Sequence, residues 1–148
     1  MVERRVRIAE IAGSSPAGST MDTKQIGILG EKIAEKYLKD KGYQILDRNY
    51  STNFKSGPLR GEIDIVAKKE NILSFIEVKT LAGVQAAFFR PEEKVNFLKQ
   101  RKIVKAAQSW LMKKRIPLDS KWQIDIVAIK IDSENKKARL RHFKNAVF

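Results

Sequence analysis

Cysteine is absent from this 148-residue chain, and histidine occurs once. Without cysteine the chain has no disulfides, no thiolate metal sites and no cysteine nucleophile, and one histidine cannot build a zinc site here. The lack of cysteine fits a reducing compartment, so we expect a cytoplasmic protein. No run of about eighteen apolar residues occurs, so we expect no membrane span.

Acidic residues are few beside the basic ones: 17 Asp and Glu stand against 30 Lys and Arg, a formal net charge of +13. An excess of this size favours a polyanionic partner such as DNA or RNA. The alternative reading is a solvated basic surface or a ribosome-adjacent protein. The length suits a single domain with one core and is too short for two ordinary domains.

The first twenty residues differ in composition from the rest of the chain. Arginines at positions 4, 5 and 7 precede the glycine- and serine-rich stretch 13–19, and no apolar segment of the signal-peptide type is present. We therefore expect residues 1–21 to be a disordered or non-native leader. The folded domain is expected to span residues 22–148.

Apolar periodicity predicts a helix that begins after Asp22, which has the capping-box spacing to Gln25, and ends at Gly42. A second amphipathic helix is expected after Pro91, with its apolar stripe at residues 103–111. Strands are predicted at residues 43–46, 61–67, 72–80, 122–131 and 138–143. The order α-β-β-β-α-β-β predicts an α/β domain with a mixed sheet flanked by helices.

Three charged residues lie on two strands that are expected to be neighbours: Asp64, Glu77 and Lys79. A charge on a buried strand is costly unless it has a partner. If two or four residues form the turn between the strands, all three share a face, with the acids within about 8 Å of each other. A three-residue turn would place Asp64 on the opposite face. Two acids and a lysine so arranged suit a divalent cation, Mg²⁺ first and Mn²⁺ as the alternative.

A cation at this place would offset charge on a scissile phosphate and lower the pKa of an attacking water, which is the chemistry of phosphodiester hydrolysis. Lys79 would contact that water or a phosphate oxygen, in an orienting, charge-stabilising or proton-transfer role. The carbonyl of Val78 and the carboxylate of Glu31, beside Gly30 in the first helix, are candidates for further metal ligands. The ordinary alternatives are a solvated helix acid for Glu31 and a structural ion pair on the strands.

Four basic residues crowd the second helix and are candidates for phosphate contacts: Lys99, Arg101, Lys102 and Lys105. The alternative for this group is a solvated helix face. We expect Asp125 to be satisfied by a neighbouring basic group and His142 to be structural.

Several motifs together resemble one known family over residues 22–148. They are Gly30-Glu31, Gly61-Glu62-Ile63-Asp64, Phe75-Ile76-Glu77-Val78-Lys79-Thr80, Lys99-Gln100-Arg101-Lys102-Ile103 and His142-Phe143-Lys144-Asn145-Ala146. Their order resembles the YraN-like family of uncharacterised bacterial proteins. That family is similar to the PD-(D/E)XK nucleases and, among them, to the archaeal Holliday-junction resolvases.

The resemblance implies a restriction-endonuclease-like fold, with Asp64, Glu77 and Lys79 at the metal and catalytic positions and Glu31 as the helix acid. Two features depart from the pattern: the loop 53–60 is longer than in the family, and Leu81 stands where an arginine is usual. The resolvases act as symmetric dimers, because a four-way junction offers two equivalent strands, so a homodimer is one assembly to test.

Three functions remain in view at this point. The first is a metal-dependent endonuclease that hydrolyses phosphodiester bonds in DNA, including branched or structured DNA. The second is a non-catalytic nucleic-acid-binding protein that retains the nuclease fold, and the third is a structural protein whose basic surface meets an acidic partner. The paired acids favour the first, since they would repel DNA unless a cation lay between them.

Overall fold

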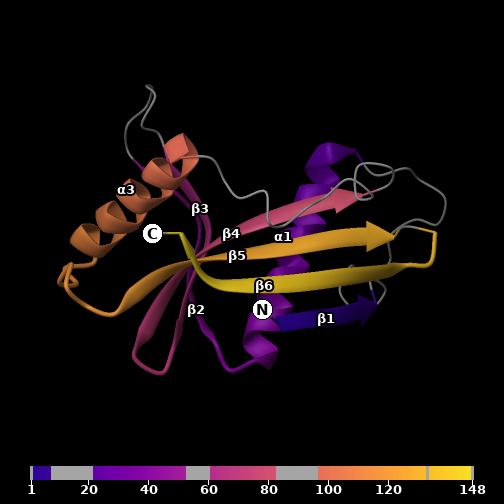
Figure 1. Ribbon diagram of the computed structural model, residues 1–148, viewed down its shortest axis with the longest axis horizontal. Helices are drawn as coiled ribbons and strands as arrows, with labels where there is room; N and C mark the ends of the chain where they lie inside the picture. Colours follow the sequence, from indigo (N-terminus) through magenta and orange to yellow (C-terminus); the bar gives the residue numbers. More distant parts are fainter. Residues whose placement is uncertain (1, 8–21, 53–60, 83–96, 133, 148) are drawn as a thin grey trace.

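The computed structural model describes residues 2–7, 22–52, 61–82, 97–132 and 134–147. Within these ranges, six strands form one sheet in the order β1-β6-β5-β4-β3-β2, with helix α1 on one face and helix α3 on the other (Figure 1). Their bounds are β1 Val2–Arg7, α1 Thr23–Asp40, β2 Gln44–Ser51, β3 Glu62–Lys69, β4 Ile72–Ala82, α3 Phe97–Lys113, β5 Trp122–Asp132 and β6 Lys137–Val147. Only β4 and β5 run parallel, so the sheet is mixed. The prediction of a mixed sheet flanked by helices is confirmed, and the architecture is consistent with a restriction-endonuclease-like fold.

Helix α1 begins and ends where the sequence predicts. The Asp22 carboxylate accepts a hydrogen bond from the Gln25 backbone N–H at 2.8 Å, and the Gln25 side chain accepts one from the Asp22 N–H at 3.0 Å. This reciprocal pairing satisfies two of the N–H groups that a helix start leaves open. Gly42 follows the helix with a φ of +92°, a conformation that glycine adopts without strain.

Strand β1 is the main difference from the expected element order. Residues 2–7 pair antiparallel with β6, so this part of the expected leader belongs to the sheet, while residues 8–21 lie outside the described residues. Val6 packs against the core from β1, and Arg4 approaches Asp40 of α1 at 3.6 Å. The strand also covers the hydrogen-bonding edge that β6 would otherwise expose.

Other element boundaries differ less. The strand expected at 43–46 extends to Ser51, and the last strand runs on to Val147. The expected helix opening at Pro91 and the long loop at 53–60 lie outside the described residues.

The sheet separates two apolar clusters. On one face Ile33 and Leu38 of α1 pack against β-strand residues that include Ile76 and Val127. On the other face Trp110 of α3 meets Phe75 edge to face, with ring centroids 5.6 Å apart. Burial of each such side chain contributes about 1.5–3 kcal/mol, so both helices are held firmly against the sheet.

The hairpin between β3 and β4 has the short turn on which the site prediction depends. Ile65 pairs with Ile76 and Lys69 with Ile72, so the turn holds two residues, the first of which has a φ of +56°. The recorded pairs end at Ile65 and Ile76, and beyond them Figure 1 shows β3 turning away from β4. The sheet therefore opens between these two strands, next to the candidate residues.

Candidate functional site

Asp64 and Glu77 lie side by side at the point where β3 and β4 separate. Ile65 and Ile76 form the last pair of the ladder, and Asp64 and Glu77 are the next residue on each strand, close enough for the Glu77 charge to raise the pKa of Asp64. The Asp64 carboxylate also accepts a hydrogen bond of 2.7 Å from the backbone N–H of Val78. This bond ties the acid of one strand to the backbone of the other where the ladder ends.

Glu31 approaches the two strand acids from helix α1. Gly30 lies directly against Thr80 of β4, where a Cβ would collide with the threonine hydroxyl. Glycine thus permits a close helix–strand contact, and the next residue is Glu31. A Cβ at Gly27 would meet nothing within 4 Å, so the close approach is made at Gly30 and not at Gly27.

Strand β2 adds a residue that the sequence reasoning missed. In the ladder between β2 and β3, Arg48 pairs with Ile65 and Tyr50 pairs with Ile63. Asn49 lies between these two pairs and therefore stands opposite Asp64. Its side chain hydrogen-bonds the Glu31 carboxylate, and its φ is +49°, a left-handed conformation that Asn tolerates better than most residues. The sequence offered no signal for it beyond that tolerance.

An ion pair fixes α1 against β2 one helical turn beyond Glu31. The Arg48 guanidinium donates to both oxygens of Glu35, with Nε 3.0 Å from Oε2. This hydrogen bond holds the pKa of Glu35 well below its usual range, at about 2. The pair therefore helps to position the helix that carries Glu31.

The three acids disturb one another. Burial, together with the charges of Glu77 and Glu31, raises the pKa of Asp64 to about 7, against the opposing effects of the Val78 N–H and Lys99. Burial also raises the pKa of Glu31, with Glu77 adding to the shift and the Asn49 hydrogen bond opposing it. Crowded, partly desolvated carboxylates of this kind are characteristic of functional sites, and also of structural ion-pair networks.

Lys99 of α3 supplies a cation to this cluster. Its ammonium lies 2.7 Å from the Glu77 carboxylate, which is 14% exposed, whereas the lysine side chain is 49% exposed. Sequence reasoning assigned Lys99 to phosphate contacts and did not foresee this pairing. Helix α3 is close to β3 as well, because a Cβ at Gly61 would collide with the backbone carbonyl of Lys102.

The donor set fits a hard divalent cation in its chemistry. Carboxylate oxygens are the ligands that Mg²⁺ and Mn²⁺ prefer, and the Lys99 ammonium already stands where positive charge relieves the repulsion between acids. Among the described residues, no group of three or more Asp, Glu or His side chains is arranged to hold an ion as it stands. Lys99 pairs with Oε1 of Glu77, so an ion bound through this oxygen would compete with the lysine.

The remaining predicted residues lie around the cluster. Lys79 follows Glu77 at the next position on the same face of β4 and is exposed, which is the placement that the alternation predicts. Arg101 and Lys105 are exposed on α3, and Lys102 is half-buried.

Asp125 and His142 form a separate, fully buried network on the α1 side of the sheet. The Asp125 carboxylate lies 2.8 Å from His142 Nε2 and accepts hydrogen bonds from Gln123 and from the Asn145 backbone, both at 2.9 Å. The Tyr37 hydroxyl lies 3.0 Å from the other ring nitrogen. The expectation that a neighbouring basic group satisfies Asp125 is confirmed, and the structural role of His142 stays a prediction.

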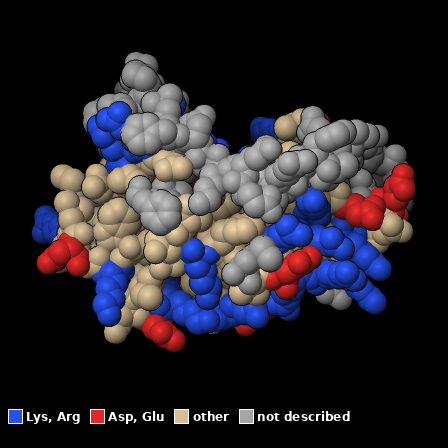
Figure 2. Space-filling view, in the orientation of Figure 1, with Lys and Arg blue, Asp and Glu red and all other residues tan. Residues whose placement is uncertain are grey.

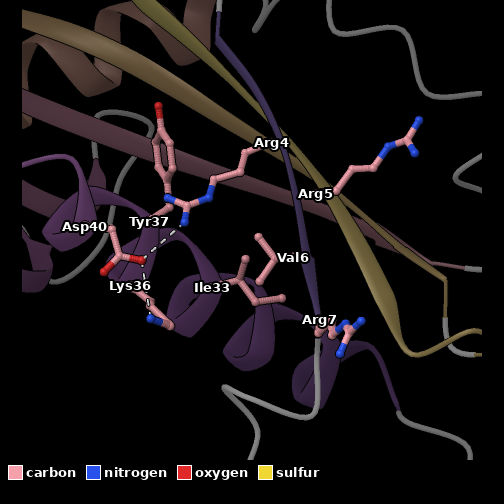
Figure 3. Close-up of a pocket in the computed structure, with 8 residues that line it drawn as sticks. All are labelled: Arg4, Arg5, Val6, Arg7, Ile33, Lys36, Tyr37 and Asp40. Atoms are coloured by element: carbon pink, nitrogen blue, oxygen red, sulfur yellow. Dashed lines mark hydrogen bonds and ion pairs between the residues drawn. The ribbon is translucent and has the colours of Figure 1, made fainter.

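A cavity of about 270 Å³ lies between β1 and α1, away from the acid cluster (Figure 3). Arg4 and Lys36 both reach Asp40 there, at 3.6 and 3.3 Å, so the acid offsets part of their charge. Figure 3 shows Arg4 turned toward Asp40 and Arg5 turned away from it, as alternation along a strand requires. The cavity brings together none of the predicted site residues.

Comparison with known proteins identifies the family. The model of the Uncharacterised protein family UPF0102 matches residues 30–129, which include every predicted site residue. The chain belongs to UPF0102. The resemblance to the YraN-like family is thereby confirmed.

UPF0102 proteins of three bacteria illustrate the likeness. The chain is 41% identical to one from Alkaliphilus oremlandii over 123 residues, which are 83% of this chain and 97% of that relative. It is 40% identical to one from Clostridium botulinum and 42% to one from Clostridium tetani, again over 83% of this chain and over 94% and 93% of those proteins. In the described part of the chain, no helix is long and apolar enough to cross a membrane.

Proposed function

We propose that this UPF0102 protein is a metal-dependent endonuclease that hydrolyses phosphodiester bonds in DNA, with branched or structured DNA as its substrate. One observation carries the proposal. Asp64 and Glu77 stand side by side where two strands separate, and burial together with mutual repulsion raises the pKa of Asp64 to about 7. An arrangement that keeps acids close together against their repulsion is expected where a divalent cation binds.

Each residue has a part that follows from its place. Asp64 and Glu77 would hold Mg²⁺, with Mn²⁺ as the alternative, together with the Val78 carbonyl and with Glu31 directly or through water. Bound metal would supply charge neutralisation at the phosphate and a more acidic water. Lys79, the next outward residue on the same face, would orient the attacking water or contact a non-bridging phosphate oxygen.

Lys99 has a different role in this proposal from that of Lys79. It neutralises Glu77 when no metal is bound and would be displaced toward the phosphate when the metal enters. Arg101, Lys102 and Lys105 would contact phosphates on the flank of the cleaved bond. The formal net charge of +13 supports a nucleic-acid substrate over a small phosphate ester.

The second candidate is a nucleic-acid-binding protein without catalysis. The observation that favours it is the Lys99–Glu77 ion pair, which stabilises one acid without any metal. A stable pair of this kind would make the cluster a structural element between α3 and β4. The two candidates differ in whether divalent ions bind at Asp64.

The experiment that separates the candidates combines substrates, metals and variants. Labelled single-stranded, duplex, flap and four-way DNA are incubated with the protein in Mg²⁺, in Mn²⁺ and in chelator. Asp64→Asn and Lys79→Met should abolish cleavage. The exposed residues before β5 give matched controls of the same chemistry, Asp119→Asn and Lys121→Met, which should cleave like the wild type.

Two results would contradict the nuclease, and a separate measurement tests the homodimer. Cleavage that survives in Asp64→Asn would come from another site or a contaminant. Binding without cleavage on every substrate and with both metals would favour the non-catalytic protein. Sedimentation on four-way DNA tests the homodimer, which predicts two chains for each junction.

A further inference from the structure

A basic surface continues from the acid cluster across four strands of the sheet. Side chains that alternate on the α3 side of β4, β5, β6 and β1 form it, beyond the part of the sheet that α3 covers (Figure 1). We call it the basic face. Its members are Lys79 and Leu81, Ala128, Lys130 and Asp132, Lys137, Arg139 and Arg141, and Glu3, Arg5 and Arg7; Ala128 is buried, and the others are half-buried or exposed.

The register aligns these side chains in rows that cross the strands. The row after Glu77 joins Lys79 to Ala128, Ala128 to Arg141, and Arg141 to Glu3. In the next row outward, Lys130 is followed by Arg139 and Arg5, and in the last Lys137 is followed by Arg7. The two outer rows therefore place basic groups on neighbouring strands, about 4.8 Å apart, whereas Ala128 separates the two basic residues of the first row, and the rows lie about 7 Å from one another.

The charge of this face is strongly unbalanced. Seven of its members are basic and two are acidic, and both acids have partners: Glu3 lies 3.5 Å from Arg139, and Asp132 accepts hydrogen bonds from Asn135. Arg5 and Arg7 are exposed, and the Arg139 side chain is 47% exposed. Figure 2 shows Lys and Arg gathered on the side of the molecule where β6 and β1 lie. So many like charges in a small area favour a polyanionic occupant.

The chemistry of the face favours the phosphate backbone of a duplex. Proteins that bind single strands stack bases on aromatic side chains, and none of the eleven described members of the face is aromatic. A surface of arginine and lysine that has no aromatic residues for base stacking suits contacts to phosphate groups, which do not depend on the DNA sequence. Glu77 on β4 and Arg5 on β1 are separated by three strand spacings in one direction and by two rows in the other, which gives a distance of roughly 20 Å. This distance corresponds to about six base pairs of duplex.

We propose that the basic face binds the backbone of a double-stranded DNA arm that leads away from the acid cluster, and that β1 extends the contact by several base pairs. This proposal rests on the proposed function for its direction, since the cleaved bond would lie at Asp64 and Glu77. The contact is independent of sequence. It acts on affinity, while the acids act on the chemical step.

The test measures binding without cleavage. Fluorescence anisotropy follows a labelled duplex, and a single strand of equal length, across a salt series in chelator. The double variant Arg5→Gln/Arg139→Gln removes two positive charges from residues that lie opposite each other in the ladder between β1 and β6. The control Lys24→Gln/Lys41→Gln removes two exposed charges at the ends of α1, the helix on the opposite face. Thermal unfolding verifies that both variants fold.

Each lost phosphate contact removes about 0.9 from the slope of log K against log salt. The variant loses two contacts, so it should bind the duplex about 50-fold more weakly at about 0.1 M salt. Equal affinity and equal slope in the variant and the control would overturn the proposal. A loss confined to the single strand would overturn the assignment to a duplex.

Cleavage assays run in parallel separate this proposal from the proposed function. If cleavage depends on Asp64 while the variant binds like the control, the basic face fails and the nuclease stands. If no form of the protein cleaves DNA and the variant still loses affinity with a smaller salt slope, the basic face stands and the nuclease fails.

Discussion

Replacement of Asp64 by asparagine should stabilise the metal-free protein at alkaline pH. The side chain is only partly exposed, and burial with the charges of Glu77 and Glu31 raises its pKa from an ordinary 3.8 to about 7. Asparagine keeps an oxygen that can accept the hydrogen bond from the Val78 N–H but carries no charge. The variant therefore removes the repulsion and retains the link between β3 and β4.

The sign and size of the effect follow from proton linkage. Because the pKa of Asp64 is higher in the folded than in the unfolded protein, the folded state binds the proton more tightly. The stability that this proton contributes is complete below about pH 4 and is lost as the pH rises to about 7. At pH 8 the ionised carboxylate costs at most about 4 kcal/mol, since one pKa unit is worth about 1.36 kcal/mol.

Urea unfolding of the wild type and of Asp64→Asn, from pH 4 to pH 8 in chelator, checks this expectation. The two free energies of unfolding should agree at pH 4 and diverge in favour of the variant up to pH 8. Added Mg²⁺ should restore the wild type at pH 8 and leave the variant unchanged, since metal binding requires the ionised acid. A difference that does not change with pH, or an equal change in the exposed control Asp119→Asn, would refute the reasoning.

Three further predictions concern the surroundings of the site. Gly30→Ala should lower the free energy of unfolding, measured by urea unfolding, by about 1–3 kcal/mol, because the new Cβ meets β4. Gly27→Ala should raise this free energy by about 1 kcal/mol, because alanine has a higher helix propensity than glycine. Equal effects of the two substitutions would exclude the close contact at Gly30. His142→Ala should cost about 3 kcal/mol by the same measurement, because its buried aspartate partner loses a hydrogen bond, and Tyr37→Phe only about 1 kcal/mol. Lys99→Met should raise the pKa of Asp64 further, because it removes the nearby cation, so the pH-dependent loss of stability should extend to higher pH in urea titrations; an unchanged pH profile would contradict the influence of Lys99 on Asp64.

Local signals in the chain were sufficient for most of the architecture. The capping box at Asp22, the apolar stripe of α3 and the short turn between β3 and β4 are read from short sequence windows, and each is confirmed. The alternation of β3 holds only in part, because Ile63 packs in the cluster on the α3 side whereas Ile65 and Ala67 pack in the cluster on the α1 side. Strand β1 was not foreseen, because arginines outnumber its two valines and a pairing with β6 depends on residues some 135 positions away. Strand pairing over such separations is not encoded in local pattern.

The candidate site shows the same division. Alternation and a short turn predict that Asp64, Glu77 and Lys79 share one face, and the two-residue turn on which this prediction depends is confirmed. The contributions of Asn49 and Lys99 could not, because each comes from an element that is distant in sequence.

Residue spacing thus determined which acids share a strand face, since side chains alternate along a strand with a fixed period of two. Only the tertiary structure decided what surrounds them: α3 delivers a lysine to Glu77, α1 delivers Glu31 across the opening between β3 and β4, and β1 widens the basic face. The physical reason is that the environment of a charge depends on burial and on neighbours brought together by packing, and packing joins residues that no short stretch of sequence contains.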